Sequence, residues 1–148
     1  MNTEVLLLIV GFFAISTVAL IVYLFISKKD NAKKVNEANK RLLPIYNDPN
    51  IGRIALWITL DSVDGEPFDD SMVYYAKVKS NMTGMNQLVE VALFRPGSYT
   101  FVVSSREFSD VSMNVVIEAG LVYQLGANED GPYFMLDSNG ARYTMKEL

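Results

Sequence analysis

The chain contains no cysteine and no histidine among its 148 residues. Their absence excludes disulfides, thiol nucleophiles, thiolate or imidazole metal sites and every histidine-based catalytic triad. A membrane-bound hydrolase built from this sequence would need two carboxylates held at a fixed separation in a cleft. The acids gather instead in apparent turns, so we expect a non-catalytic protein with no catalytic residue and no cofactor.

Charge is missing from one long stretch near the beginning of the chain, residues 5–26. As a helix this stretch would cover about 33 Å, which matches a hydrocarbon core of about 30 Å. No Lys or Arg precedes it and no small-x-small cleavage site follows it, so a retained anchor is preferred to a cleaved signal peptide. The sequence therefore predicts a single-pass transmembrane helix over residues 5–26, after a tail of residues 1–4.

Basic residues gather directly after this stretch, at Lys28, Lys29, Lys33 and Lys34. The positive-inside rule then predicts a cell-membrane protein with its N-terminus outside and its C-terminal domain in the cytoplasm. The same lysines could bind anionic lipid headgroups. The alternative is that they are only a topology signal on a solvated stalk.

Residues 27–50 read as a basic helical stalk and linker. This segment has helix formers, a thin apolar stripe that includes Ala38 and Leu42, and no proline before Pro44. The residue before a proline resists the α conformation, so we expect the helix to end at Pro44.

Positive charge is scarce in the remainder of the chain. Residues 51–148 carry seven Lys and Arg against thirteen Asp and Glu. Nucleic-acid binding needs clustered Lys and Arg to neutralise phosphates, so we expect no nucleic-acid partner.

Hydrophobic residues alternate with a period of two from Arg53 onward, which predicts an all-β domain over residues 51–148. The expected strands are residues 54–60, 72–78, 87–94, 99–103, 111–117, 121–125, 133–136 and 141–144. About seven or eight short strands with regular turns predict a small β-sandwich, with a small open barrel as the alternative. The residues expected to face a core in sets are Ile54, Leu56, Ile58 and Leu60; Val89, Val91 and Leu93; Tyr99, Phe101 and Val103; and Val111, Met113, Val115 and Ile117.

Two strand–turn–strand units within this domain carry a resemblance. The segments Leu93-Phe-Arg-Pro-Gly-Ser-Tyr-Thr-Phe101 and Val115-Val-Ile-Glu-Ala-Gly-Leu-Val-Tyr-Gln-Leu125 resemble the repeat pattern of PEGA-like and transthyretin-like bacterial β-sandwich domains. The resemblance implies an Ig-like or transthyretin-like sandwich with a non-catalytic role. It also implies an extracytoplasmic location, which conflicts with the orientation predicted from charge.

Five carboxylates lie within the ten residues 61–70, namely Asp61, Asp64, Glu66, Asp69 and Asp70. Hard oxygen ligands in a loop that contains glycine could hold Ca²⁺. The spacing differs from that of an EF-hand, and the alternative is a solvated connection between strands.

Three aromatic residues could form a partner surface. Trp57 should point away from the apolar face of its strand, and the neighbours Tyr74 and Tyr75 should face opposite sides of theirs. An exposed Trp and Tyr can anchor a protein partner or stack on a sugar ring. The alternative is that both faces of the sandwich are partly covered, one of them by the connector.

The function predicted from these features is a membrane-anchored protein-interaction module that acts as an accessory or structural subunit of a larger membrane complex. The alternative is an extracytoplasmic domain that binds carbohydrate or Ca²⁺. The side of the membrane on which the domain lies distinguishes the two.

Overall fold

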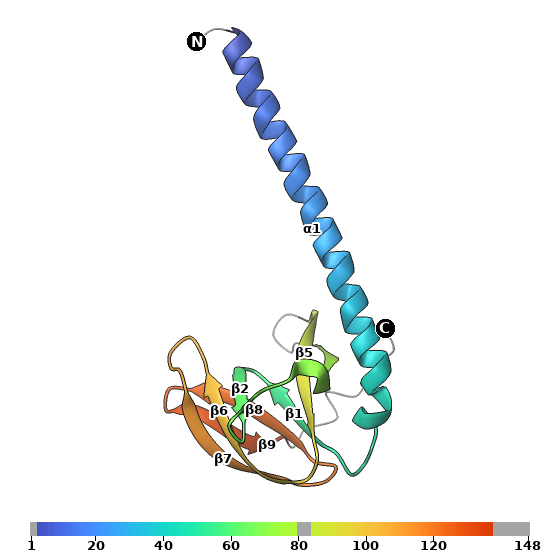
Figure 1. The fold of residues 1–148 in the computed structure, drawn as a ribbon, viewed down its shortest axis with the longest axis vertical. Helices are drawn as coiled ribbons and strands as arrows, with labels where there is room; N and C mark the ends of the chain where they lie inside the picture. The colour runs from blue at the N-terminus through green and yellow to red at the C-terminus, as the bar shows by residue number, and fades with distance from the viewer. Residues whose placement is uncertain (1–2, 80–83, 138–148) are drawn as a thin grey trace. The chain divides into compact units, whose positions relative to one another are not determined.

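The computed structural model describes residues 3–79 and 84–137 and divides the chain into two compact units, residues 1–37 and 38–148. Its one α-helix in the described residues is α1 (Thr3–Tyr46). Within the described part of the chain, no helix has the length and hydropathy expected of a membrane span. The first unit is helical throughout its described residues, and the second contains the last turns of α1 and all of the strands (Figure 1).

The end of α1 differs from the prediction, because the helix continues past Pro44 to Tyr46. Leu42 and Tyr46 flank the proline and are both buried, so tertiary packing stabilises the last turn. The lost N–H of Pro44 removes one helical hydrogen bond. The turn is closed beyond it by the N–H of Asn47, which donates to the carbonyl of Leu43 at 3.1 Å.

The strands form two sheets. The first sheet has the order β4 (Val73–Lys79), β5 (Asn86–Phe94), β1 (Gly52–Leu56), β8 (Val122–Asn128) and β9 (Gly131–Leu136). The second has the order β3 (Glu66–Pro67), β2 (Thr59–Val63), β6 (Gly97–Ser104) and β7 (Val111–Ile117). Strands β1 and β8 are parallel and every other described pair is antiparallel. A short 3₁₀ helix, η1 (Asp70–Met72), precedes β4.

The two sheets share one hydrophobic core, so the fold is β-sandwich-like. Its buried members come from both sheets: Ile54, Ala92, Tyr123 and Leu125 from the first, and Leu60, Phe101, Val103, Val115 and Ile117 from the second. The inward positions predicted for Phe101 and Val103 are confirmed, since neither has any exposed surface.

The strand predicted over residues 54–60 is two strands instead. The chain leaves the first sheet after Leu56 and enters the second at Thr59. At this corner the N–H of Trp57 donates to the carbonyl of Leu125 at 2.9 Å. Alternation alone could not place the break, because Leu56 and Ile58 pack against the same core on either side of it. The strand predicted over residues 141–144 lies outside the described residues.

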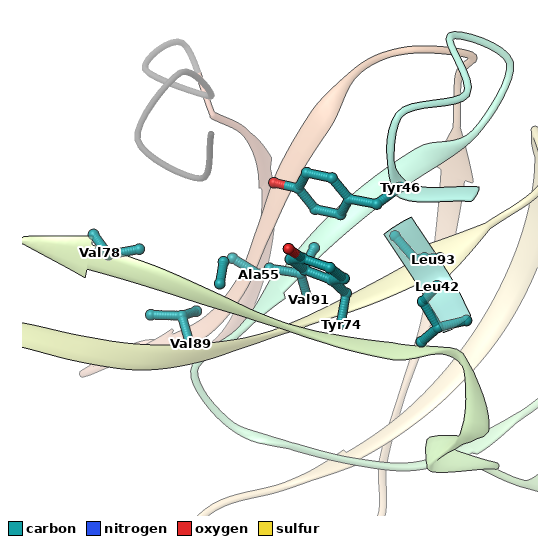
Figure 2. Close-up of a cluster of buried hydrophobic side chains, with 9 residues drawn as sticks. Leu42, Tyr46, Ala55, Tyr74, Val78, Val89, Val91 and Leu93 are labelled. Atoms are coloured by element: carbon teal, nitrogen blue, oxygen red, sulfur yellow. The ribbon is translucent and has the colours of Figure 1, made fainter. Parts of the chain in front are cut away.

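The other face of the first sheet carries a second core, which the last turns of α1 cover (Figure 2). Its buried residues are Leu42, Tyr46, Ala55, Tyr74, Ala76, Val78, Val89, Val91 and Leu93. Arg53 fixes the helix end, because its Nε donates to the carbonyl of Tyr46 at 2.7 Å and its guanidinium lies 5.3 Å from the centre of the Tyr46 ring. The first sheet is therefore a middle layer, with a helix on one face and the second sheet on the other.

Candidate functional site

Trp57 lies at the corner between β1 and β2, where the chain passes from one sheet to the other. Its neighbours along the chain, Leu56 and Ile58, pack against the core between the sheets. Its own side chain is 45% exposed. Because the backbone of Trp57 is hydrogen-bonded to β8, this large apolar side chain is displayed from a rigid position.

Two grooves adjoin at Trp57. The larger has a volume of about 760 Å³, and its lining includes Arg106, Glu107 and Glu129; we call it the Arg106 groove. The smaller has a volume of about 380 Å³, and its lining includes Tyr75 of β4; we call it the Tyr75 groove. Trp57, Ile58 and Thr59 line both grooves, and Trp57 is the largest of the three side chains.

Two of the three predicted aromatic residues line the same groove. Tyr75 is half-buried and shares the Tyr75 groove with Trp57, together with the carboxylates of Glu90 and Asp70. Burial raises the pKa of the Tyr75 hydroxyl above its ordinary value, and the nearby charges of Glu90 and Asp70 raise this pKa further. The hydroxyl therefore stays protonated and able to donate a hydrogen bond at physiological pH.

Tyr74 does not join them, although it was one of the three residues predicted for a partner surface. Its side chain has no exposed surface. The ring faces that of Tyr46 (Figure 2), and the two are stacked with a centroid distance of 4.2 Å. Burial also raises the pKa of its hydroxyl. The connector covers this face of the sheet, so Tyr74 is a core residue.

Asn39 is a polar residue of the core that the sequence analysis missed. Its side-chain amide is bound to both backbone groups of Tyr75: Nδ2 donates to the Tyr75 carbonyl at 2.8 Å, and Oδ1 accepts from the Tyr75 N–H at 2.8 Å. Since β4 is the last strand of the first sheet, the amide takes the place of a neighbouring strand at this point. The sequence does contain a sign of this role. Asparagine is unfavourable in the interior of a helix, and Asn39 lies there beside the apolar stripe.

The five acids of the predicted Ca²⁺ site are not brought together. No described group of three or more acidic side chains is arranged to hold a metal ion. Asp61 accepts a hydrogen bond from the hydroxyl of Ser104, and Asp64 accepts one from the N–H of Thr100 at 2.7 Å. Asp69 caps η1 through Ser71, whose hydrogen bonds hold the pKa of Asp69 below its ordinary value. These carboxylates act as turn and cap acceptors, while Glu66 is exposed on β3 and Asp70 lines the Tyr75 groove.

The four lysines proposed to contact lipid headgroups all lie on α1 and are exposed: Lys28, Lys29, Lys33 and Lys34. Lys33 lies 4.0 Å from the carboxylate of Glu37, one turn further along the helix. A pair this exposed contributes little to stability.

Searches of protein-family models, of curated proteins and of solved structures find no match for this chain. The resemblance to PEGA-like and transthyretin-like domains therefore stays a prediction.

Proposed function

We propose that this chain is a non-catalytic, membrane-anchored protein-interaction module, an accessory or structural subunit of a larger membrane complex with its β domain in the cytoplasm. The observation that carries the proposal is Trp57, a half-exposed indole on a rigid corner between two grooves. Tryptophan is enriched among residues that dominate protein–protein binding energy, because a large apolar ring can fill a pocket on the partner.

A second feature supports binding to another protein. In the described part of the chain, β7 pairs with β6 on one side only and is the last strand of its sheet. Its seven residues, Val111–Ile117, include neither a charged residue nor a proline. An edge of this kind lacks the usual protection against strand pairing and can accept a strand from a partner.

The anchor follows from the sequence. An uncharged stretch over residues 5–26, followed by four lysines, is the pattern of a single-pass span with its basic flank in the cytoplasm. Anchoring would confine the β domain near its partner and raise the effective concentration for binding. The finer fold we propose is an Ig-like or transthyretin-like sandwich, and the lysines would meet anionic headgroups.

The test is co-purification of the full chain in mild detergent, with Trp57→Ala compared with the native chain. A partner that stays with the native chain and is lost from the variant is the expected result. Met135→Ala is the matched control, because Met135 is an apolar side chain on β9 with 52% exposure and lies outside both grooves. Recovery of the native chain alone and monomeric would contradict the proposal.

A second candidate function is a carbohydrate-binding domain outside the cell. Its support is the groove that Trp57 and Tyr75 share, since aromatic rings can stack on a sugar and the carboxylates of Glu90 and Asp70 can accept hydrogen bonds from its hydroxyls. Protease added to intact cells would digest the β domain only in this second case. Protection of the domain would exclude it.

A further inference from the structure

Part of the lining of the Tyr75 groove is aliphatic, and we call it the floor. Its accessible surface comes from the partly exposed Leu56 and Ile58, while Leu60 and Val73 are 5% and 2% exposed and contribute little. A floor of this kind favours a methylene chain over a hydrated polar group, because burying apolar surface is favourable and burying an unpaired polar group is costly.

The walls of the groove are aromatic. Trp57, at the corner between β1 and β2, and Tyr75 of β4 both line it. The face of an indole or phenol ring attracts a cation, with Trp the stronger of the two.

The rim of the groove is negative. Glu90 and Asp70 both line it and are both exposed, and no basic residue is among the groove's lining residues. Neither carboxylate forms an ion pair with another described residue. After burial, the charges of Glu90 and Asp70 also raise the pKa of the Tyr75 hydroxyl.

From these three properties we infer that the Tyr75 groove binds a lysine or arginine side chain projecting from a protein partner. The apolar floor contacts the methylene stem, Trp57 and Tyr75 flank the cationic head, and Glu90 and Asp70 neutralise its charge. Lysine and arginine have an apolar stem and a charged head, and the groove has a complementary surface for each of the two. This inference rests on the proposed function and names the chemistry of the partner at the Trp57 site.

The chain contains a single tryptophan, so its intrinsic fluorescence reports on Trp57 alone. The full chain in mild detergent is titrated with a short acetylated oligolysine peptide, and then with an oligoarginine peptide and an oligoglutamate peptide. We expect the two basic peptides to change the Trp57 emission with saturation and the acidic peptide to leave it unchanged. No saturable change with either basic peptide would overturn the inference.

Charge-neutral variants separate a specific site from the general attraction of an acidic domain. The double variant Asp70→Asn with Glu90→Gln should weaken oligolysine binding about tenfold, since each exposed charge pair contributes less than a factor of ten. The control double variant Glu66→Gln with Glu118→Gln removes the same charge from exposed positions outside the groove. An equal loss in both double variants would overturn the inference, because the binding would then be non-specific.

Two further experiments test whether the cation belongs to a protein and whether the Trp57 ring contacts it. If spermidine binds as tightly as the peptides, the ligand of the groove is a small free cation, and the inference of a side chain from a protein partner is overturned. Trp57→Ala, followed by calorimetry because the variant lacks the fluorophore, should weaken oligolysine binding about fivefold. Unchanged binding in Trp57→Ala would contradict the assigned role of the ring.

The inference can fail while the proposed function stands. A partner that co-purifies through Trp57 but is retained by the Asp70→Asn, Glu90→Gln variant would keep the interaction module and exclude a basic side chain in this groove. Loss of the partner in that variant, with retention in the Glu66→Gln, Glu118→Gln control, is the result we expect.

Discussion

Tyr74 and Tyr75 are neighbours on β4, yet they lie in opposite environments. Tyr74 is sealed beneath the last turns of α1 and stacked on Tyr46, whereas Tyr75 lines a groove that opens to solvent beside Trp57. Strand alternation sends the two side chains to opposite faces of the first sheet. The last turns of α1 cover Tyr74, which makes it a structural residue. Tyr75 lines a groove that α1 does not line, so its side chain is available for binding.

The covered face also closes a sheet edge. Asn39 of α1 binds both backbone groups of Tyr75, so part of the β4 edge is occupied by a side-chain amide. The β7 edge has no equivalent cover in the described residues. The end of α1 therefore protects the β4 edge, while the Trp57 corner and the β7 edge stay exposed in the described residues.

The largest effect should come from breaking the covered face. We expect Tyr74→Ala to lower the free energy of unfolding by about 3–5 kcal/mol, because it removes a buried aromatic side chain and leaves a cavity. Denaturant unfolding of the full chain in detergent measures this effect. Tyr75→Ala is the matched control on the same strand, and it should cost clearly less because its side chain is only half-buried. Equal losses would remove the distinction between the faces.

A smaller effect is expected from opening the β4 edge. Asn39→Ala leaves the N–H and carbonyl of Tyr75 without their helix partner, which should cost about 1–3 kcal/mol. Lys40→Ala, at the exposed neighbouring position, should change stability by less than about 0.5 kcal/mol. A variant of Asn39 as stable as the native chain in the same unfolding measurement would show that the amide does not protect this edge.

The corner at Trp57 should tolerate truncation of its side chain. Trp57→Ala should cost about 1 kcal/mol or less, because nearly half of the side chain is already in solvent. The thermal transition should stay cooperative by circular dichroism. A collapse of that transition would assign Trp57 to the core and remove it from the partner surface.

The smallest effect is a dependence of stability on alkaline pH. Burial raises the folded-state pKa of Tyr74 and Tyr75 above the ordinary value of 10.0. A raised pKa gives stability that is fully present below the ordinary value and is lost as pH rises through the folded values. Denaturant midpoints measured across this window should therefore fall, and Tyr74→Phe should reduce the slope. If stability falls as steeply with pH in Tyr74→Phe as in the native chain, the effect does not come from the raised pKa of Tyr74.

The sequence predicted those features that depend on alternation along one strand. Phe101 and Val103 face the core as expected, and Tyr74 and Tyr75 take opposite faces. It failed where a tertiary contact decides the outcome. Pro44 was expected to end the helix, but the burial of Leu42 and Tyr46 extends it. The break between β1 and β2 was missed because both sides of it pack on one core.

The candidate site could be predicted only in part for the same reason. Residue type suggested Trp57 and the two tyrosines, but only the packing of α1 decides which tyrosine is covered. Asp70 of η1 and Glu90 of β5 lie on different elements, and only the pairing of β4 with β5 brings them to the same groove as Trp57. Asn39 was missed because its partner is a backbone group 36 residues away.

The central claim is that Trp57 is exposed in a groove that it shares with Tyr75 and with the carboxylates of Asp70 and Glu90. Quenching of its fluorescence by caesium and by iodide, two ions of opposite charge, tests this directly. We expect caesium to quench the folded chain more strongly than iodide, and the difference to shrink in the Asp70→Asn, Glu90→Gln variant but not in the Glu66→Gln, Glu118→Gln control. A tryptophan that neither ion quenches, or an equal response in both double variants, would contradict the account.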